Sequence, residues 1–149
     1  MHYIEALQTY DGKEPSLFLA GGITGCPDWQ QEMITALSNT SLVVFNPRRT
    51  QFFSHKDAAK EQIIWEYTHL CKATAISFWF PQETLCPIAL YELGAWSMTN
   101  KKIFIGVHPA YQRIQDVRIQ TALARPDVQI VTSIEYLAQD IVSWTKKSI

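Results

Sequence analysis

The sequence has few of the features that mark membrane-bound or nucleic-acid-binding proteins. It has 149 residues, a net charge of −1, and basic residues that cluster only in short pairs such as Lys101-Lys102. No stretch would supply the positive field that a phosphate backbone requires, so we expect no nucleic-acid polymer as a partner. The longest apolar run is far shorter than a membrane span, so we expect no membrane association.

Cysteine is also scarce. Cys26, Cys71 and Cys86 make an odd number, and none of them stands in a CxxC pair. In a chain of this size, that pattern is typical of a reduced, intracellular protein. The first residues also lack the basic-then-apolar pattern of a secretory signal. We therefore expect a cytoplasmic protein.

The best-known catalytic and cofactor motifs do not occur. The four histidines have no metal-ligand spacing, apart from a weak His69-x-Cys71 pair, and no GxSxG sequence is present. The glycine-containing segment Gly21-Gly22-Ile23-Thr24-Gly25 matches neither GxGxxG nor GxxxxGK[ST]. We therefore expect neither a metal nor a cofactor.

Strand-like and helix-like segments alternate along the chain. Polar residues 1–16 are expected to form a lead-in or a short hairpin. The apolar runs predict strands at 17–20, 41–45, 75–80, 103–107 and 128–131, and helical spacing predicts helices at 29–37, 57–72, 87–100, 113–124 and 133–147. This alternation predicts a single α/β domain with a five-stranded parallel sheet and helices on both faces. A flavodoxin-like, three-layer fold with strand order 2-1-3-4-5 is the simplest arrangement.

In that order the topology reverses between the first and third strands, where open α/β sheets bind ligands. The Gly21–Gly25 loop and the segment 81–92 would meet there. Glycine lets a ligand approach the backbone closely, although a plain strand-to-helix turn would need the same residues.

Glu92 is the leading candidate for a reactive group. It is the lone carboxylate in the apolar segment Pro87–Trp96, and Pro87 suits the first helical position. A carboxylate in such surroundings is costly unless it is paired or used. The alternative is a helix glutamate that bonds a backbone N–H or a distant cation.

Other candidates lie in the middle of the chain. Asn46 and Arg48 follow the second strand, and Arg48 or Arg49 could meet a phosphate or carboxylate. Glu66 is a second candidate carboxylate, or an ordinary solvated glutamate. Phe52-Phe53 could form a lid, a base-stacking wall or a satellite core.

Two carboxylates beside an apolar crevice are suited to acetal chemistry at a sugar carbon. One acts as nucleophile and the other as general acid, and a separation of about 5 Å favours retention of configuration. Burial or a nearby like charge would keep the acid neutral near pH 7.

Several segments together resemble the nucleoside 2-deoxyribosyltransferase family, particularly its compact transferase-like branch. They are Phe18–Thr24, Val44–Arg48, Trp65-Glu66 leading into 75–80, and Pro87–Trp96 with its Glu-Leu-Gly. The resemblance runs from about Leu17 to Asp116. It implies one family domain over residues 1–149, a flavodoxin-like fold and exchange of bases on 2-deoxyribose. The implied partners are a deoxyribonucleoside and a free nucleobase. The aromatic residues expected around the site favour a purine base.

The resemblance also implies residue roles. Glu92 becomes the nucleophile that forms a deoxyribosyl-enzyme ester. Glu66 becomes the proton donor to the leaving base, with Tyr67 as the candidate in a looser alignment. The substrate-binding residues that we expect are Gly21, Gly22, Ile23, Asn46, Arg48, Trp65, Thr84, Pro87 and Asp116.

The chain departs from the family at the sugar site. The family commonly has a sugar-binding carboxylate shortly before its catalytic glutamate, where this chain reads Glu83-Thr84-Leu85-Cys86. The family also completes each site from a neighbouring subunit. A homo-oligomer with shared active sites is therefore implied, and Asp116 or Gln120 could supply the shared residue.

Two other functions use the same residues. The first is an N-glycosidase that hydrolyses a nucleoside or a nucleoside 5′-monophosphate, with water in place of the second base. The second is a non-catalytic nucleotide-sensing module, suggested by the missing sugar-binding carboxylate, because a fold does not fix a function.

Overall fold

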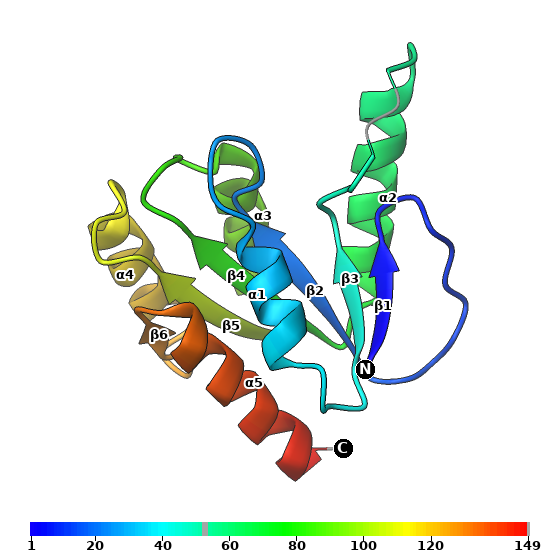
Figure 1. Ribbon diagram of the computed structural model, residues 1–149. Helices are drawn as coiled ribbons and strands as arrows, with labels where there is room; N and C mark the ends of the chain where they lie inside the picture. Colours follow the sequence, from blue (N-terminus) through cyan, green and yellow to red (C-terminus); the bar gives the residue numbers. More distant parts are fainter. Residues whose placement is uncertain (52–53, 149) are drawn as a thin grey trace.

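The computed structural model describes residues 1–51 and 54–148, so the alternatives for Phe52-Phe53 lie outside the described residues (Figure 1). Strands and helices alternate along most of the chain. In order they are β1 (His2–Glu5), β2 (Ser16–Gly21), α1 (Trp29–Ala36), β3 (Val43–Asn46), α2 (Ala58–Lys72), β4 (Ala75–Phe80), α3 (Pro87–Ser97), β5 (Lys102–Val107), α4 (Ile114–Ala124), β6 (Ile130–Val131) and α5 (Ile134–Ser148).

The sheet is parallel throughout, in the order β1-β3-β2-β4-β5-β6. The five strands predicted from the sequence lie in the predicted order. The prediction of five strands in total was wrong, because the described residues form six. The extra strand, β1, pairs with β3 at the edge of the sheet. Its four residues bury only Ile4 fully, so they lack the apolar run that identified the other strands. The likeness to flavodoxin-like folds stays a prediction.

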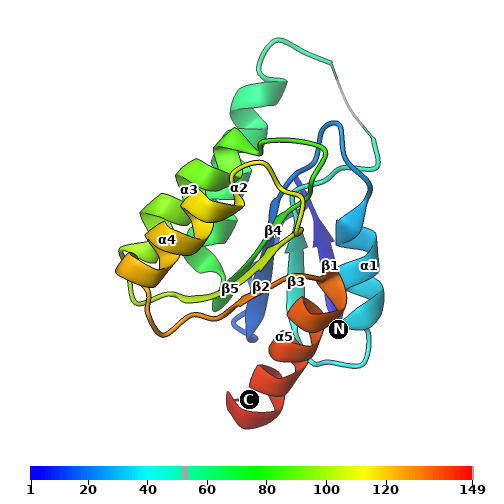
Figure 2. The ribbon, with the colours of Figure 1, turned by 90° about the vertical axis from the view of Figure 1, so that its left-hand side faces the viewer.

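Helices cover both faces of the sheet, which gives three layers. Helices α2, α3 and α4 lie on one face, and α1 and α5 lie on the other (Figure 2). Alternate residues of a strand point to opposite faces. In β2, Phe18 and Ala20 therefore join the core under α2 to α4, while Leu17 and Leu19 join the core under α1 and α5.

Burial on both faces explains the sequence of the central strands. Every residue of β4 is buried, and so are the first five residues of β2. Strands covered on both sides read as continuous apolar runs, so these two were the clearest in the sequence. Helix α1 is capped by the side chain of Asp28, which accepts the N–H of Gln31 at 3.1 Å. Within the described parts of the chain, no helix is both long and apolar enough to cross a bilayer.

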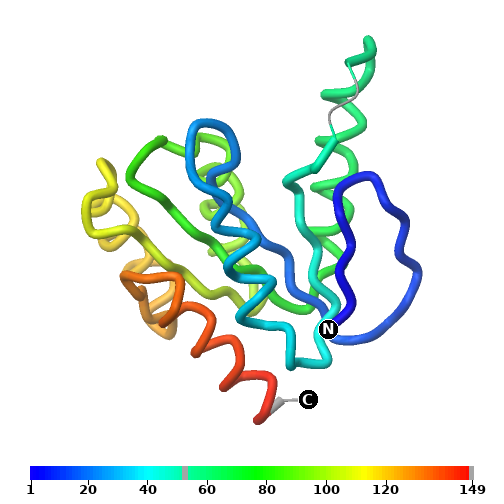
Figure 3. The backbone as a smooth tube through the Cα atoms, viewed as in Figure 1, coloured from blue at the N-terminus to red at the C-terminus, as the bar shows by residue number. Residues whose placement is uncertain are grey.

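Strands β2 and β4 end side by side, with Gly21 opposite Trp79. The segments that leave them, residues 22–28 and 81–86, run close to each other (Figure 3). A Cβ atom on Gly22 would lie 2.9 Å from the Pro81 ring and 3.0 Å from the Cys86 sulfur. The two loops therefore touch at the carboxyl end of the sheet, where a parallel α/β sheet binds its ligands.

Two glycines allow a test of this packing with opposite expected signs. In Gly21→Ala the new methyl group would lie 2.3 Å from the backbone oxygen of Trp79, at a φ of +152°, and strand and loop would have to move apart. We expect a loss of about 2–4 kcal/mol in the free energy of unfolding.

The control is Gly94→Ala in α3, where a Cβ would meet nothing within 4 Å. Alanine favours a helix over glycine, so we expect a gain of about 0.5–1 kcal/mol. Urea unfolding of the two variants measures both effects, and similar changes in the two would contradict this account of Gly21.

Candidate active site

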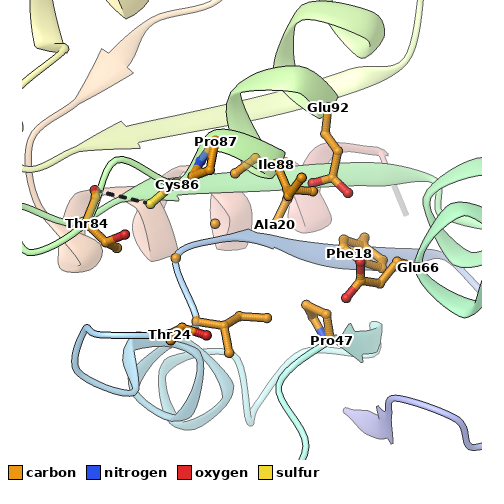
Figure 4. Close-up of a pocket in the computed structure, with 14 residues that line it drawn as sticks. Phe18, Ala20, Thr24, Pro47, Glu66, Thr84, Cys86, Pro87, Ile88 and Glu92 are labelled. Atoms are coloured by element: carbon orange, nitrogen blue, oxygen red, sulfur yellow. Dashed lines mark hydrogen bonds between the residues drawn. The ribbon is translucent and has the colours of Figure 1, made fainter. Parts of the chain in front are cut away.

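A cavity of about 340 Å³ opens where the two loops meet (Figure 4). A volume of this order is typical of small-molecule sites. Its walls come from β2, the 22–24 loop, the residue after β3, helix α2, the 81–86 loop and the start of α3. The lining residues are Phe18, Ala20, Gly21, Gly22, Ile23, Thr24, Pro47, Glu66, Thr84, Cys86, Pro87, Ile88, Ala89 and Glu92.

Helix α3 carries Glu92 into this cavity. Its start is fixed by Cys86, which adopts the left-handed conformation at φ +49° and whose carbonyl accepts the N–H of Leu90 at 3.0 Å. The preceding turn is held by the Tyr111 hydroxyl, which donates to Leu85 O at 2.8 Å. Pro87 occupies the first turn, as predicted. The entry to the helix is therefore constrained on both sides of Cys86, and this sets the direction of Glu92.

The Glu92 carboxylate points into the cavity and is partly buried (Figure 4). Among the described residues it accepts no hydrogen bond and forms no ion pair, in contrast to Glu61, which pairs with His55 at 2.9 Å. The described contacts therefore do not support the alternative, in which Glu92 would bond a backbone N–H or a cation. An unpaired carboxylate in an apolar wall is costly, which is the pattern expected of a functional group.

Glu66 approaches the same cavity from α2 (Figure 4). Its Oε1 accepts a hydrogen bond of 2.7 Å from Nε2 of Gln62, one turn earlier in the helix. Tyr67, the alternative in the looser alignment, is 68% exposed and does not line the cavity. The structure therefore brings Glu66, and not Tyr67, to face Glu92.

The two carboxyl groups differ in their tendency to ionise. Burial, and after it the negative charge of Glu66, raises the pKa of Glu92 to about 8. Burial also raises the pKa of Glu66, but the Gln62 hydrogen bond and the positive charge of Arg49 oppose that rise. Glu66 consequently ionises first, and Glu92 keeps its proton near pH 7.

The glycine loop is held by side chains from α1 and from the end of β3. Gly22 O accepts the indole N–H of Trp29 at 2.8 Å and the amide of Gln30 at 3.1 Å. Arg48 donates to Ile23 O at 2.7 Å and lies 3.5 Å from the Asp28 carboxylate. These donors engage the loop carbonyls and hold the loop that forms this wall of the cavity.

The cavity unites most of the residues proposed from the sequence. They are Gly21, Gly22, Ile23, Glu66, Thr84, Pro87 and Glu92. Thr84 lies on the side of the cavity away from the two carboxylates in Figure 4, near the Cys86 thiol, which donates to Thr84 O at 3.5 Å.

Four proposed residues do not line it. Asn46 is buried and bonds Tyr3 and the Arg48 N–H, while the Arg48 side chain is engaged with the glycine loop. Trp65 stacks on His69 at 4.0 Å in the core. Asp116 pairs with Arg113 at 3.1 Å and borders a separate cleft between α3 and α4. Substrate contacts by these four residues stay predictions.

The structure also adds residues that the sequence reasoning missed. Phe18 lines the cavity and lies between the two carboxylates in Figure 4, and Pro47 and Cys86 also line it. Gln62 anchors Glu66 from one turn away. The position of Gln62, four residues before a candidate carboxylate in a helix, was the one available signal.

No group of three or more histidine, cysteine, aspartate or glutamate side chains within residues 1–51 and 54–148 is arranged to hold a metal ion. The chemistry on offer is a pair of carboxyl groups of unequal acidity in an apolar cavity at the carboxyl edge of a parallel sheet. This is the equipment of enzymes that act on glycosidic bonds.

The comparison with protein families makes the class more specific. A family model described as "Nucleoside 2-deoxyribosyltransferase like" matches residues 14–111, and the chain belongs to this family. The match covers β2 to β5 and every residue that lines the cavity. Family membership indicates a glycosyl-transferring enzyme that acts on nucleosides and nucleobases. No curated protein matches the sequence.

The raised pKa of Glu92 predicts a pH dependence of stability. Between the usual glutamate pKa of about 4.3 and the native value of about 8, the folded protein binds more protons than the unfolded chain. Wild-type stability should therefore fall as the pH rises through this range. Glu92→Gln removes this dependence, so the variant should gain on the wild type by about 2 kcal/mol between pH 5 and pH 9, after allowance for partial exposure.

Urea unfolding at pH 5, 7 and 9 measures the difference between the two proteins. Glu32→Gln, on the exposed face of α1, is the matched surface control. A difference between Glu92→Gln and wild type that stays constant with pH would refute the assignment.

Proposed function

We propose that the protein transfers a 2-deoxyribosyl group between nucleobases by a retaining double displacement through a deoxyribosyl ester of Glu92. The observation that carries the proposal is the unpaired Glu92 carboxyl group, which faces Glu66 across an apolar cavity. Family membership indicates the substrate class, which is a deoxyribonucleoside and a nucleobase.

In the first half-reaction an oxygen of Glu92 attacks the anomeric carbon of the deoxyribonucleoside. The bond between that carbon and the base nitrogen breaks, and its electron pair stays with the base. Glu66 delivers a proton to the base, which leaves as the neutral free nucleobase. The product on the enzyme is a neutral ester, with inverted configuration at the anomeric carbon.

In the second half-reaction a new base loses its N–H proton to Glu66 as its nitrogen attacks the ester carbon. Glu92 leaves as a carboxylate, and the second inversion restores the original configuration. The proton that Glu66 has taken up then passes to Glu92, and the pair is back in its starting state.

The ionisation of the pair suits this cycle. The first half-reaction needs one carboxylate as nucleophile and one proton for the base, so the pair must start with one proton and one negative charge. The unequal acidities of Glu66 and Glu92 provide this state near pH 7. The proton rests on Glu92, and it passes to the base by way of Glu66 as Glu92 attacks.

The remaining walls suit a flat, weakly polar base. Phe18, Ala20, Pro47 and Ile88 present apolar or aromatic surface beside the carboxylates. Such surface favours stacking and burial of a heterocycle, and a purine offers the larger area. These contacts support the proposed preference for purines.

The experiment is incubation of the protein with deoxyinosine and adenine, followed by chromatography of the bases and nucleosides. We expect deoxyadenosine and hypoxanthine to form together. Glu92→Ala removes the nucleophile and should reduce the rate by about a thousandfold or more. Glu32→Ala, which changes an exposed glutamate of α1, is the control.

The other outcomes separate the alternatives. Hypoxanthine without deoxyadenosine would identify a hydrolase. Full activity in Glu92→Ala would refute the assigned nucleophile. Binding of nucleosides without turnover, tested also with pyrimidine donors and 5′-monophosphates, would identify a sensing module.

We propose also that the protein is a homo-oligomer in which the face formed by α2, α3 and α4 is the contact surface. Large apolar side chains are exposed on these three helices, whereas α5 on the other face exposes only Tyr136 among the described residues. They are Ile63, Ile64, Tyr67, Ile88, Tyr91, Ile119 and Leu123 on the helices, and Met98 directly after α3. Exposed large apolar side chains gathered on one face are typical of a protein contact. Because Ile88 also lines the cavity, a neighbouring subunit on this face would lie at its mouth.

A charge on this surface should weaken the assembly. Tyr91, which is 79% exposed in the middle of α3, does not line the cavity. We expect Tyr91→Glu to lower the molar mass measured by analytical ultracentrifugation, and Tyr136→Glu on α5 to leave it unchanged. A wild-type protein that is monomeric at tens of micromolar concentration would contradict the proposal.

A further inference from the structure

Gln62 ties together two walls of the cavity. Its side-chain Nε2 donates to the backbone oxygen of Pro47 at 2.9 Å and to Oε1 of Glu66 at 2.7 Å. Pro47 belongs to the segment after β3, and Glu66 belongs to α2. Both residues line the cavity, whereas Gln62 stands behind them and does not.

The orientation of the Gln62 amide follows from its neighbours. A rotation that exchanged its nitrogen and oxygen would place an acceptor against the acceptor oxygens of Pro47 and Glu66. In the orientation that donates, the Gln62 Oε1 atom is buried and has no hydrogen-bond partner among the described residues. A buried acceptor without a donor is costly, so the two donated bonds hold this side chain in place.

We propose that Gln62 is a positioning residue of the site: by donating to Pro47 and Glu66 at once, its amide holds the Glu66 carboxylate toward the cavity in its charged form. This inference deepens the proposed function and rests on it for its catalytic meaning. The contact itself does not depend on turnover: a Glu66 oxygen accepts from Gln62 whether or not the carboxyl group is protonated, and it accepts more strongly as an anion. Gln62 does not touch the cavity, so it acts on the substrate only through Glu66.

The charged and titratable groups around Glu66 are few. Arg49, from the segment after β3, lowers the pKa of Glu66, as does the Gln62 hydrogen bond, while burial raises it. Glu92 faces it from α3, and the negative charge of Glu66 raises the pKa of Glu92. The Cys86 thiol also lines the cavity, but burial raises its pKa to about 12, so it stays neutral. Among the described residues, Gln62 is therefore the uncharged donor that, together with the positive charge of Arg49, favours the charged form of Glu66.

The consequence for the reaction is a fixed division of roles. With its donor in place, Glu66 holds the charge and waits for a proton, and Glu92 holds the proton. Without the donor, the pKa of Glu66 rises, and a share of the enzyme would carry a proton on both groups, which leaves no carboxylate for the attack. The carboxylate would also lose the bond that fixes its side-chain rotamer, and misplaced catalytic groups lose rate.

The test is a titration of the glutamate side-chain carboxyl groups by ¹³C NMR, which needs no turnover. Spectra of Glu66→Gln and Glu92→Gln assign the two signals. In Gln62→Met, which keeps the side-chain length and removes the donor, the Glu66 signal should titrate at higher pH than in the wild type. In Gln62→Lys, which returns an N–H donor with a positive charge, it should titrate at lower pH.

The matched control is Gln139→Met in α5. Gln139 also donates its amide to a glutamate one turn away, Glu135, at 3.3 Å, but on an exposed surface. This variant should leave the Glu66 signal unchanged. Gln62→Leu repeats the test if Gln62→Met does not fold.

An unmoved Glu66 titration in Gln62→Met would overturn the inference, whatever the activity. A moved titration in a protein that transfers no deoxyribose would support the role of Gln62 and refute the proposed function. Where transfer is found, kcat/KM of Gln62→Met should fall about tenfold at neutral pH. The acidic limb of its pH profile should shift to higher pH, a change that simple loss of folded protein would not produce.

Discussion

The pairing of β2 with β4 at the centre of the sheet is the constraint on which the site depends. The register that sets Gly21 opposite Trp79 ends both strands at the same level, and a side chain at Gly21 would collide with the backbone of β4. Both strands then turn outward into loops that touch at Gly22. The cavity lies beside that contact and is lined by both loops. Helix α3 starts directly after the 81–86 loop. The position of Glu92 is therefore a consequence of how two buried strands end.

The second constraint is electrostatic. Two carboxyl groups share a cavity that is largely apolar, and such surroundings disfavour a second negative charge. The two groups have different neighbours, and this difference favours the charged form of Glu66. Gln62 and Arg49 stabilise the Glu66 anion, and Glu92 has no such partner among the described residues. The same burial that makes Glu92 costly as an anion would make it a strong nucleophile once a substrate excludes water, because little solvation would then be lost.

Much of this could be predicted from the sequence, and the reason is burial. Strands covered on both faces, such as β2 and β4, show continuous apolar runs, and Glu92 is conspicuous as the one charge in an apolar helix. The edge strand β1 was missed because it buries one residue fully. Alternation of elements and right-handed connections leave few possible strand orders, and the simplest of them places Glu92 at the switch point before any contact is known.

Side-chain direction could not be predicted in the same way. Trp65 and Glu66 are neighbours in the sequence, but adjacent residues of a helix point about 100° apart, so Glu66 faces the cavity and Trp65 faces the core. Arg48 follows β3, at the edge of the sheet where a ligand was expected, yet its side chain donates to three carbonyl groups of the segment 22–28. The contact of Gln62 with Pro47 joins residues that are 15 positions apart, and no repeating pattern in the sequence predicts such a contact.

The clamp formed by Trp29, Gln30 and Arg48 has a consequence for the kinetics of binding. A glycine-rich loop that is free in solution must lose conformational entropy when a ligand arrives, and part of the binding free energy is then spent on ordering it. Here that ordering is completed when the chain folds. A substrate therefore meets a wall that already has its final shape. Ordering of the glycine loop does not slow the association of the substrate.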